Sequence, residues 1–358
     1  MSESTTSEST TSGPAASDAN APGAGLDLAA VNRWLVANAP GVPELVRAWL
    51  ISGGRSNLTY GVAAADGDEY CLRRPPLGPL VKSAHNVARE YRIMHALRDT
   101  DVPVPPMVAL CEDESVIGGP FFLSRFVEGT VAGSEEAIES LSPTVRERAA
   151  GELARRLAAI HSLDLKAIGL DELSPPVGYV ERQLRRWRSQ LTPDDLARRP
   201  AFGQVADLLD EQLPAQQRVA LAHGDFKLGN VIIDAEGAVR AVLDWELTAL
   251  GDPLADLGWL VASWSGPDES APRVNPPPGR FPGFGDRSAL VSGYGAASDL
   301  DLSKLPYYEA FAEWRWACID LGIYKRYTSG AMGESQIDLD VVEGELDDRL
   351  RIALDRLS

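Results

Sequence analysis

The sequence predicts an α+β fold with two lobes, the first mainly β and the second mainly helical. Short apolar segments separated by turn residues fill most of 26–126, whereas apolar residues recur at helical spacing through much of 127–358. The chain has 358 residues, of which 44% are hydrophobic, and this is enough for a sizeable core. We therefore expect one lobe over 26–126 and a second lobe over 127–358.

Composition narrows the classes of partner. The net charge of −18 argues against nucleic acid, whose phosphates require a basic face, and against an anionic membrane. Three cysteines without C-x-x-C spacing indicate a reducing compartment. No apolar run reaches the ~20 residues that span a bilayer, and no signal peptide is evident. We expect a cytoplasmic protein whose residues 1–25, rich in Ser, Thr, Ala and Gly, form a disordered tail.

The first lobe is expected to alternate strands with two helices. The helices are predicted at Asp27–Asn38 and Ala84–Asp99, and the strands at Leu45–Ile51, Leu58–Ala64, Glu69–Arg74, Met107–Cys111 and Pro120–Phe126. The Gly-rich turn at 52–57 can place backbone N–H groups over a phosphate, although a plain hairpin is the simpler interpretation.

A cation on the third strand is the candidate phosphate ligand of this lobe. Strand alternation places Cys71 and Arg73 on one face. In kinases this strand supplies a Lys that binds phosphates and pairs with a helix Glu, and Arg73 stands in its place. Arg is always charged and grips oxygens bidentately, but it is not equivalent to Lys. A surface Arg on an edge strand is the alternative, and Lys82 is the other candidate cation.

The second lobe is expected to be built from helices around a short β-rich centre. Helices are predicted at Thr144–His161, Tyr179–Gln190, Phe202–Gln212, from Asp252-Pro253 onward, Leu305–Tyr327 and Ile337–Leu357. The Pro-rich stretch Ser265–Asp286 either flanks the acceptor site or is a disordered insertion. Glu313 and Asp320 could meet a cationic acceptor, but we expect them on a solvated face.

The stretch from Leu221 to Asp234 carries the chemistry. His223, Asp225 and Asn230 follow H-x-D-x-x-x-x-N, the spacing of a kinase catalytic loop. Asp244 ends a β-rich run, where the D-F-G aspartate stands in protein kinases. A polar hairpin with solvated side chains is the alternative, and the complete set of polar residues argues against it.

These residue types suit phosphoryl transfer, which needs charge neutralised and atoms aligned. Asp225 would orient and deprotonate an acceptor hydroxyl, and Lys227 would offset charge on the transferring group. Mg²⁺ prefers oxygen ligands and retains several waters, so the amide of Asn230 and the carboxylate of Asp244 suffice beside the nucleotide phosphates.

Three segments resemble the aminoglycoside phosphotransferase family, which has the protein-kinase-like fold: 223–230, 243–246 and 251–259. Within it, the chain is most similar to the branch related to the kinase-like domain of some acyl-CoA dehydrogenases. The resemblance implies ATP or GTP, Mg²⁺ and a small-molecule hydroxyl acceptor. It also implies structural roles for His161 and Asp256. It assigns cofactor binding to Gly53, Gly54, Ser56 and Asn57 in a covering loop, to Arg73 paired with Glu90, and to Ser124 and Phe126 at the hinge.

We therefore predict a Mg²⁺-dependent phosphotransferase that moves the γ-phosphoryl group of ATP to a hydroxyl group. In this prediction, 26–126 is the nucleotide-binding lobe and 127–358 the catalytic, acceptor-binding lobe. The alternative is a catalytically inactive nucleotide-binding module that acts through a partner, and Arg73 in place of Lys is its main support. A protein kinase is disfavoured because no A-P-E segment follows Asp244.

Overall fold

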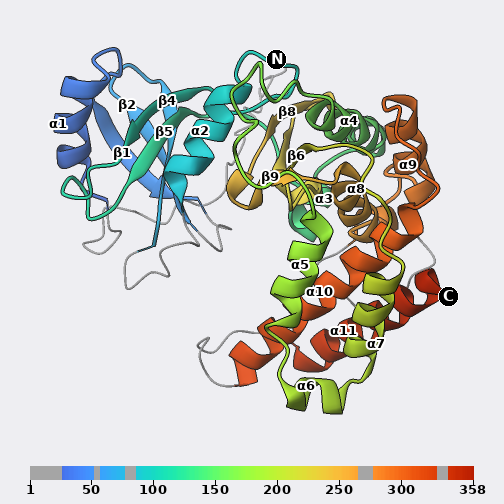
Figure 1. Cartoon of the computed structure of the whole chain (residues 1–358). Helices are drawn as coiled ribbons and strands as arrows, with labels where there is room; N and C mark the ends of the chain where they lie inside the picture. The colour runs from blue at the N-terminus through green and yellow to red at the C-terminus, as the bar shows by residue number, and fades with distance from the viewer. Residues whose placement is uncertain (1–25, 52–56, 77–85, 265–276, 329–337) are drawn as a thin grey trace, which may run out of the picture. The chain divides into compact units, whose positions relative to one another are not determined.

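The computed structural model describes residues 26–51, 57–76, 86–264, 277–328 and 338–358 (Figure 1). The chain divides into two compact units, Met1–Tyr91 with Pro106–Phe126 and Arg92–Pro105 with Val127–Ser358. The segment 92–105, which we had assigned to the first lobe, groups with the second unit. Its backbone explains why, since the carbonyl of Pro103 accepts from Val242 N at 2.8 Å and that of Asp101 accepts from Arg156 Nη1 at 2.9 Å.

The first unit is a five-stranded antiparallel sheet with the order β1-β2-β3-β5-β4. Its elements are α1 (Leu28–Asn38), β1 (Leu45–Leu50), β2 (Leu58–Ala64), β3 (Glu69–Arg74), β4 (Met107–Cys111), β5 (Phe121–Arg125) and the start of α2 (Val87–Leu97). Helix α1 begins where predicted, because the side chain of Asp27 accepts from Ala30 N at 2.9 Å. The predicted strands of this lobe are confirmed.

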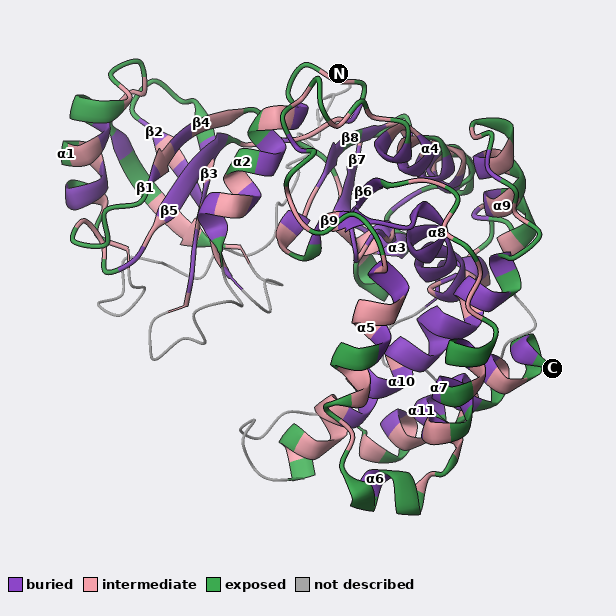
Figure 2. Ribbon diagram, viewed as in Figure 1, coloured by how far each residue is buried: buried purple, intermediate pink, exposed green. Residues whose placement is uncertain are grey.

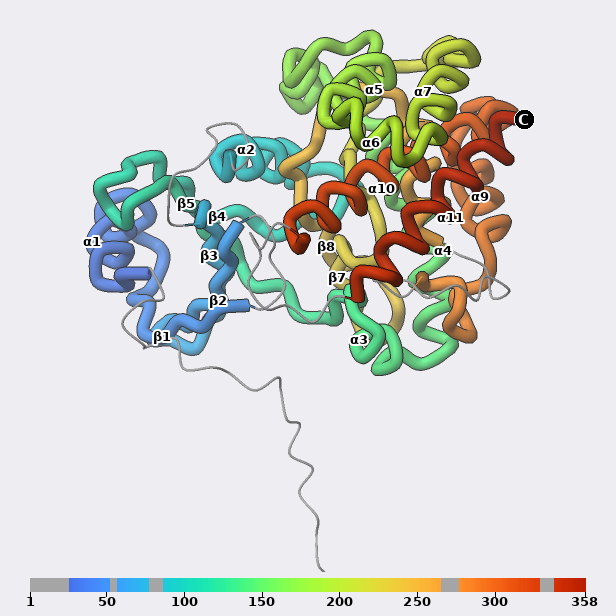
Figure 3. Tube along the Cα trace, turned by 90° about the horizontal axis from the view of Figure 1, so that it is seen from below, coloured from blue at the N-terminus to red at the C-terminus, as the bar shows by residue number. Residues whose placement is uncertain are grey.

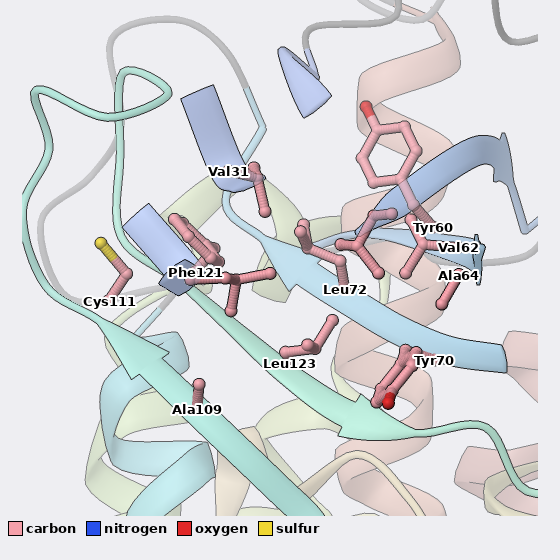
Figure 4. Close-up of a cluster of buried hydrophobic side chains, with 12 residues drawn as sticks. Val31, Tyr60, Val62, Ala64, Tyr70, Leu72, Ala109, Cys111, Phe121 and Leu123 are labelled. Atoms are coloured by element: carbon pink, nitrogen blue, oxygen red, sulfur yellow. The ribbon is translucent and has the colours of Figure 1, made fainter. Parts of the chain in front are cut away.

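The core of this unit lies on one face of the sheet (Figure 4). Tyr70 and Leu72 of β3 are buried there with Phe121 and Leu123 of β5, and Val31 of α1 packs into the same cluster. The alternation predicted for β3 holds, since Cys71 and Arg73 are only half-buried on the opposite face. One face of the sheet therefore provides stability, and the other presents Arg73.

The second unit is mainly helical. Its helices are α3 (Glu135–Glu139), α4 (Pro143–His161), α5 (Tyr179–Arg188), α6 (Pro193–Arg198), α7 (Ala201–Glu211), α8 (Pro253–Ala262), α9 (Arg287–Ala296), α10 (Leu305–Thr328) and α11 (Leu339–Leu357), with short 3₁₀ helices η1 (Leu228–Asn230), η2 (Trp245–Leu247) and η3 (Pro278–Arg280). Helices α3, α6 and α9 were not predicted. The first two have five and six residues, too few to show a helical period in the sequence.

Two small antiparallel sheets lie within the helical unit. Strand β6 (Ala220–Ala222) pairs with β9 (Ala249–Gly251), and β7 (Val231–Ile233) forms a hairpin with β8 (Val239–Val242). The hairpin turns because the Asp234 side chain accepts hydrogen bonds from Glu236 N at 3.1 Å and Ala238 N at 2.8 Å. The loop between β6 and β7 and the segment after β8 contain the candidate catalytic residues.

Helix α8 is buried along its whole length, and most of α10 is buried as well (Figure 2). The two helices approach closely at Gly258, where a Cβ atom would stand 2.5 Å from the carbonyl oxygen of Tyr308. Helix α11 runs alongside α10 (Figure 3). Helices α8 and α10 contact the candidate catalytic loop, and α11 packs against α10. Within the described residues, no helix is both long and apolar enough to cross a membrane.

Candidate active site

The loop between β6 and β7 is anchored by one buried carboxylate. Asp256 of α8 accepts from His223 N at 2.5 Å and from Gly224 N at 2.9 Å. Its position is set by the start of α8, where Asp252 caps the helix by accepting from Leu254 N at 3.1 Å and Pro253 fills the first turn. The helix N-terminus therefore fixes the backbone that precedes Asp225.

Asp256 is ionised within this buried setting. Burial is the strongest influence and favours the protonated form, but contacts with His161, His223 and the Gly224 amide outweigh it and hold the pKa of Asp256 below its usual value. His161 lies 3.5 Å from Asp256 through Nε2 and 2.7 Å from the Tyr294 hydroxyl through Nδ1. Both histidine nitrogens are thus engaged in the buried support of the loop.

His223 also supports the loop, and its hydrogen bonds indicate its tautomer. Nδ1 accepts from Asp225 N at 3.3 Å, so Nε2 carries the proton and donates to Leu243 O at 2.9 Å. Gly224 beside it has a φ of +86°, and a Cβ atom there would stand 2.8 Å from Leu247 O. The glycine is required by both the turn and the close approach of the next segment.

Asp225 is the most densely bonded polar group of the loop. Oδ1 accepts from Trp259 Nε1 at 2.9 Å, and Oδ2 accepts from Asn230 Nδ2 at 2.8 Å. Lys227 Nζ lies 3.0 Å from both carboxylate oxygens. The side chain of Asp225 is 16% exposed and that of Lys227 is 31% exposed, so the ion pair opens toward solvent while Trp259 behind it is buried.

The orientation of the Asn230 amide follows from its neighbours. Nδ2 donates to the backbone oxygen and to Oδ2 of Asp225, both at 2.8 Å, and these two groups can only accept. The amide oxygen Oδ1 is therefore directed away from Asp225, and no hydrogen-bond donor reaches it from the described part of the chain. This orientation leaves a neutral oxygen ligand available.

The β7–β8 hairpin places Asp244 beside Asn230. Leu243 N donates to Asn230 O at 2.8 Å, directly beyond the Val231–Val242 pair of the hairpin. Asp244, the next residue, has φ 66° and ψ 57°, and it is the one non-glycine residue with positive φ among those described. Asp tolerates the left-handed region better than most residues, yet such backbone is typical of functional positions.

These residues fit a magnesium ion. The candidate ligands are one amide oxygen from Asn230 and one half-buried carboxylate from Asp244, which is the hard oxygen set that Mg²⁺ accepts with phosphates and water. Within the described residues, no cluster of three His, Cys, Asp or Glu side chains has metal-binding geometry. The donor set therefore suits a metal that receives further oxygen ligands from a nucleotide.

In the first unit, the structure pairs Arg73 with Glu90, as the resemblance implied. Arg73 Nε lies 3.0 Å from Glu90 Oε2, with the carboxylate side chain 2% exposed. Cys71 stands on the same face of β3, and burial raises the pKa of its thiol to about 12. The neighbouring thiol is therefore neutral, and Glu90 provides the negative charge that aligns the guanidinium.

The other cofactor residues assigned to this unit lie in different settings. Asn57 is 2% exposed, and neither polar atom of its side chain has a hydrogen-bond partner within the described residues. Ser124 is buried in β5, and Phe126 follows the strand, with its N–H donating to Glu69 O at 3.1 Å. The remaining assignments, Gly53, Gly54, Ser56 and the alternative cation Lys82, lie outside the described residues.

The expectation of a solvated face at Glu313 and Asp320 was wrong. Both side chains are buried, and Arg349 of α11 contacts them at 2.8 and 3.0 Å. Arg349 also contacts Glu345 at 2.5 Å, so the three carboxylates surround one cation. Burial lowers the pKa of Arg349, but the three carboxylates outweigh this effect and raise it above its usual value. These carboxylates are committed to Arg349 and do not form a receptor for a cationic acceptor.

Three residues of α8 and α10 that contact the loop were not identified from the sequence. Trp259 of α8 contacts Asp225, Arg315 of α10 donates from Nη2 to Gly224 O at 2.6 Å, and Trp316 lies under Lys227, whose Nζ is 5.3 Å from its ring centroid. Helical spacing identified such residues as core and gave no sign of their polar contacts. Of the Pro-rich stretch Ser265–Asp286, residues 265–276 lie outside the described ranges.

Comparisons with known proteins agree with this arrangement. Residues 49–286 match the model of the Phosphotransferase enzyme family. Acyl-CoA dehydrogenase family member 10 of Mus musculus is 37% identical over 289 residues, which cover 77% of this chain and 26% of that protein. The chain thus spans about a quarter of the length of this curated relative.

Solved structures show the same fold. A Ralstonia eutropha protein described as a candidate aminoglycoside phosphotransferase is 30% identical, with a TM-score of 0.76 over 92% of this chain and 98% of that one. The GDP and kanamycin complex of APH(2")-IIIa is 15% identical, with a TM-score of 0.61 over 91% and 98%, and it shares the fold. The chain therefore belongs to the phosphotransferase enzyme family and has the protein-kinase-like fold of the aminoglycoside phosphotransferases.

Proposed function

We propose that this chain transfers the γ-phosphoryl group of ATP or GTP to a hydroxyl group of a small molecule, with Mg²⁺. One observation carries the proposal: Asp225, Lys227 and Asn230 form one hydrogen-bonded group at the end of the hairpin that also carries Asp244. Family membership and a structural relative that binds GDP and kanamycin support the nucleotide and the class of acceptor.

Asp225 is the catalytic base of this proposal. It orients the acceptor hydroxyl and takes its proton as the acceptor oxygen bonds to the γ-phosphorus. The bond from that phosphorus to the bridging oxygen breaks, and the nucleoside diphosphate leaves. Lys227 contacts both oxygens of Asp225 and is the more exposed partner. It turns toward the transferring phosphoryl group, and this frees a lone pair of Asp225 for the acceptor.

Asn230 and Asp244 would hold the metal, through the amide Oδ1 and the carboxylate. Mg²⁺, when bound, neutralises charge on the nucleotide phosphates. In the first unit, Arg73 binds phosphate oxygens in the role that Lys has in kinases, and its contact with Glu90 keeps the guanidinium aligned. Asn57, Ser124 and Phe126 remain proposed nucleotide contacts, together with Gly53, Gly54 and Ser56.

The test is ADP or GDP release with a panel of hydroxyl-bearing metabolites and aminoglycosides. We expect Asp225→Asn to lower turnover by about 10²- to 10⁴-fold, the usual contribution of a general base. The matched control is Asp234→Asn at the turn of the same hairpin, where an amide keeps the oxygen that accepts from the turn amides. Equal turnover by wild type and Asp225→Asn would contradict the proposal.

The alternative function, a nucleotide-binding module without transfer activity, predicts a different pattern. Mg²⁺-dependent stabilisation by ATP would then appear in thermal unfolding and disappear in Asp244→Ala, with no nucleoside diphosphate formed from any acceptor. The Arg73–Glu90 pair weakens this alternative, because the contact that Lys makes in active kinases is present with Arg.

A further inference from the structure

The carboxylate of Asp225 receives a hydrogen bond from outside its own loop. Trp259 Nε1, on α8, donates to Oδ1 at 2.9 Å. The other side chains that donate to this carboxylate, Lys227 and Asn230, belong to the loop and are half-buried, whereas Trp259 is 2% exposed. The indole is thus the donor with the least freedom to move when a substrate arrives.

This use of an indole differs from that of the other fully buried tryptophans. Trp245 donates to Val242 O at 2.9 Å, Trp314 to Phe202 O at 3.0 Å and Trp264 to Gly285 O at 3.2 Å. A buried indole N–H needs an acceptor, and in these cases a backbone carbonyl provides it. Trp259 alone of these four donates to a carboxylate, and that carboxylate is the proposed catalytic base.

Two consecutive residues of α10 hold the ring of Trp259. Trp316 stacks on it with a centroid distance of 4.3 Å and an interplanar angle of 6°. The guanidinium carbon of Arg315 lies 4.1 Å from the centroid of the same ring, and Arg315 also donates to Gly224 O at 2.6 Å. Helix α10 therefore contacts the backbone before Asp225 and the indole that binds its side chain. We call Trp259, Arg315 and Trp316 the indole clamp.

Helix α11 continues this support. The guanidinium carbon of Arg349 lies 4.9 Å from the ring centroid of Trp316, within the range of a cation–π contact. Arg349 is held in turn by the carboxylates of Glu313, Asp320 and Glu345. A continuous series of contacts, through the half-buried Trp316, thus connects α11 with the candidate catalytic loop.

We propose that Trp259 is a positioning residue that fixes the rotamer of Asp225, and that α10 and α11 set its position through the indole clamp. The inference rests on the proposed function, because Asp225 must be the group that takes the acceptor proton. With Oδ1 held by the indole, Oδ2 is the oxygen that receives the proton once Lys227 turns toward the phosphoryl group. If Asp225 loses this position, the chemical step slows and kcat falls, whereas the affinity for substrates, and so KM, is preserved.

The test compares Trp259→Phe with Trp314→Phe. Each substitution removes one indole N–H from a fully buried ring and leaves an aromatic side chain. ADP formation from Mg-ATP is followed with the acceptors of the panel and with water. We expect Trp259→Phe to lower kcat by roughly tenfold to hundredfold, the value of a hydrogen bond to a charged group, with KM for ATP within about twofold. Trp314→Phe keeps kcat within about twofold of wild type.

A second comparison separates positioning from a general loss of structure. If Trp259 acts through Asp225, Trp259→Phe in an Asp225→Asn background leaves the residual kcat unchanged. Should Trp259→Phe not fold, Trp316→Leu tests the indole clamp instead. It removes the ring that stacks on Trp259 but keeps the N–H of Trp259, so a fall in kcat shows that stacking holds the indole in place.

Three outcomes overturn the inference. In the first, Trp259→Phe and Trp314→Phe have the same kcat. In the second, Trp259→Phe lowers the rate of Asp225→Asn by the same factor as it lowers the wild-type rate. In the third, Trp259→Phe raises KM for ATP and leaves kcat unchanged. Failure of the proposed function is distinct: Asp225→Asn then has the wild-type rate, or the wild type forms no ADP with any acceptor. In that case both the proposed function and this inference are rejected.

Discussion

The two units hold their charged residues in different ways. In the helical unit, Asp225 has donors from its own loop and from α8, and Asp256 fixes the preceding backbone. In the β unit, Arg73 is paired with Glu90 on a half-buried face of the sheet. The candidate catalytic loop is thus supported by a buried polar network, whereas the candidate phosphate ligand Arg73 stands on a half-buried face of a sheet.

This difference suggests that, in the helical unit, the same buried contacts stabilise the fold and position the candidate catalytic residues. In the β unit, the core stabilises the fold and the opposite face of the sheet carries Arg73. A buried network fixes geometry, but each member depends on the others and is costly to break. An ion pair whose cation is partly exposed, as Arg73 is, contributes less to stability. We therefore expect substitutions in the helical unit to change both stability and turnover, and those in the β unit to change mainly nucleotide affinity.

The largest effect on stability is expected at Arg349. Arg349→Leu leaves three buried carboxylates without their shared cation, and breaking a buried ion pair costs about 3–5 kcal/mol of unfolding free energy. Urea unfolding measures this loss. The control is Arg351→Leu on the same helix, where the side chain is 63% exposed and its ion pairs should contribute less than about 0.5 kcal/mol. Similar losses in the two variants would contradict the buried network.

A smaller effect is expected at Asp256. Asn has one acceptor oxygen where Asp has two, so Asp256→Asn leaves the N–H of His223 or Gly224 unsatisfied at a cost of about 1–3 kcal/mol. Turnover should fall as well, because this backbone positions Asp225. At Asp286, which caps α9, Asn serves equally well as a cap, so Asp286→Asn should change neither quantity.

The contribution of Asp256 should also depend on pH. Its pKa is lower in the folded chain than the ordinary value of 3.8, so the folded state binds the proton more weakly than the unfolded state does. The stabilisation is therefore present above about pH 4 and is lost as the pH falls through the folded-state pKa. The difference in unfolding free energy between wild type and Asp256→Asn should shrink below pH 4. A constant difference across this range would show that the carboxylate charge is not involved.

The smallest effect on stability is expected in the β unit. Arg73→Lys keeps the charge but loses the planar fork, so we expect KM for ATP to rise about tenfold, equivalent to roughly 1.4 kcal/mol of binding free energy. The unfolding free energy should change by less than about 1 kcal/mol. Arg47→Lys on exposed β1 is the control and should leave KM unchanged. A large loss of stability in Arg73→Lys would remove the distinction between the units.

Local patterns in the sequence predicted much of the fold and which residues lie together in the candidate catalytic loop. Residues such as Tyr70 and Leu72 alternate along β3, and Asp27 and Asp252 cap helices that begin directly after them. The spacing of Asp225 and Asn230 is also local, since a five-residue interval places both in one loop. Such features are fixed by neighbours in the chain and can be recognised without knowledge of the tertiary structure.

The contacts that support the loop could not be predicted in this way. Trp259 meets Asp225 across 34 residues, and Arg349 meets Glu313 across 36. A tryptophan at helical spacing indicates a core position but not the acceptor of its N–H, and an acidic residue on a helix resembles a solvated one until its partner helix is in place. The left-handed backbone of Asp244 likewise depends on how β8 continues into η2.

The central claim is that Asn230 and Asp244 bind the metal beside the catalytic carboxylate of Asp225. A crystal structure of the chain with Mg²⁺ and a non-hydrolysable ATP analogue tests it most directly. We predict a magnesium ion about 2.0–2.1 Å from Asn230 Oδ1 and from a carboxylate oxygen of Asp244, with phosphate oxygens and water completing the octahedron. A nucleotide-bound metal that neither side chain contacts would contradict the account.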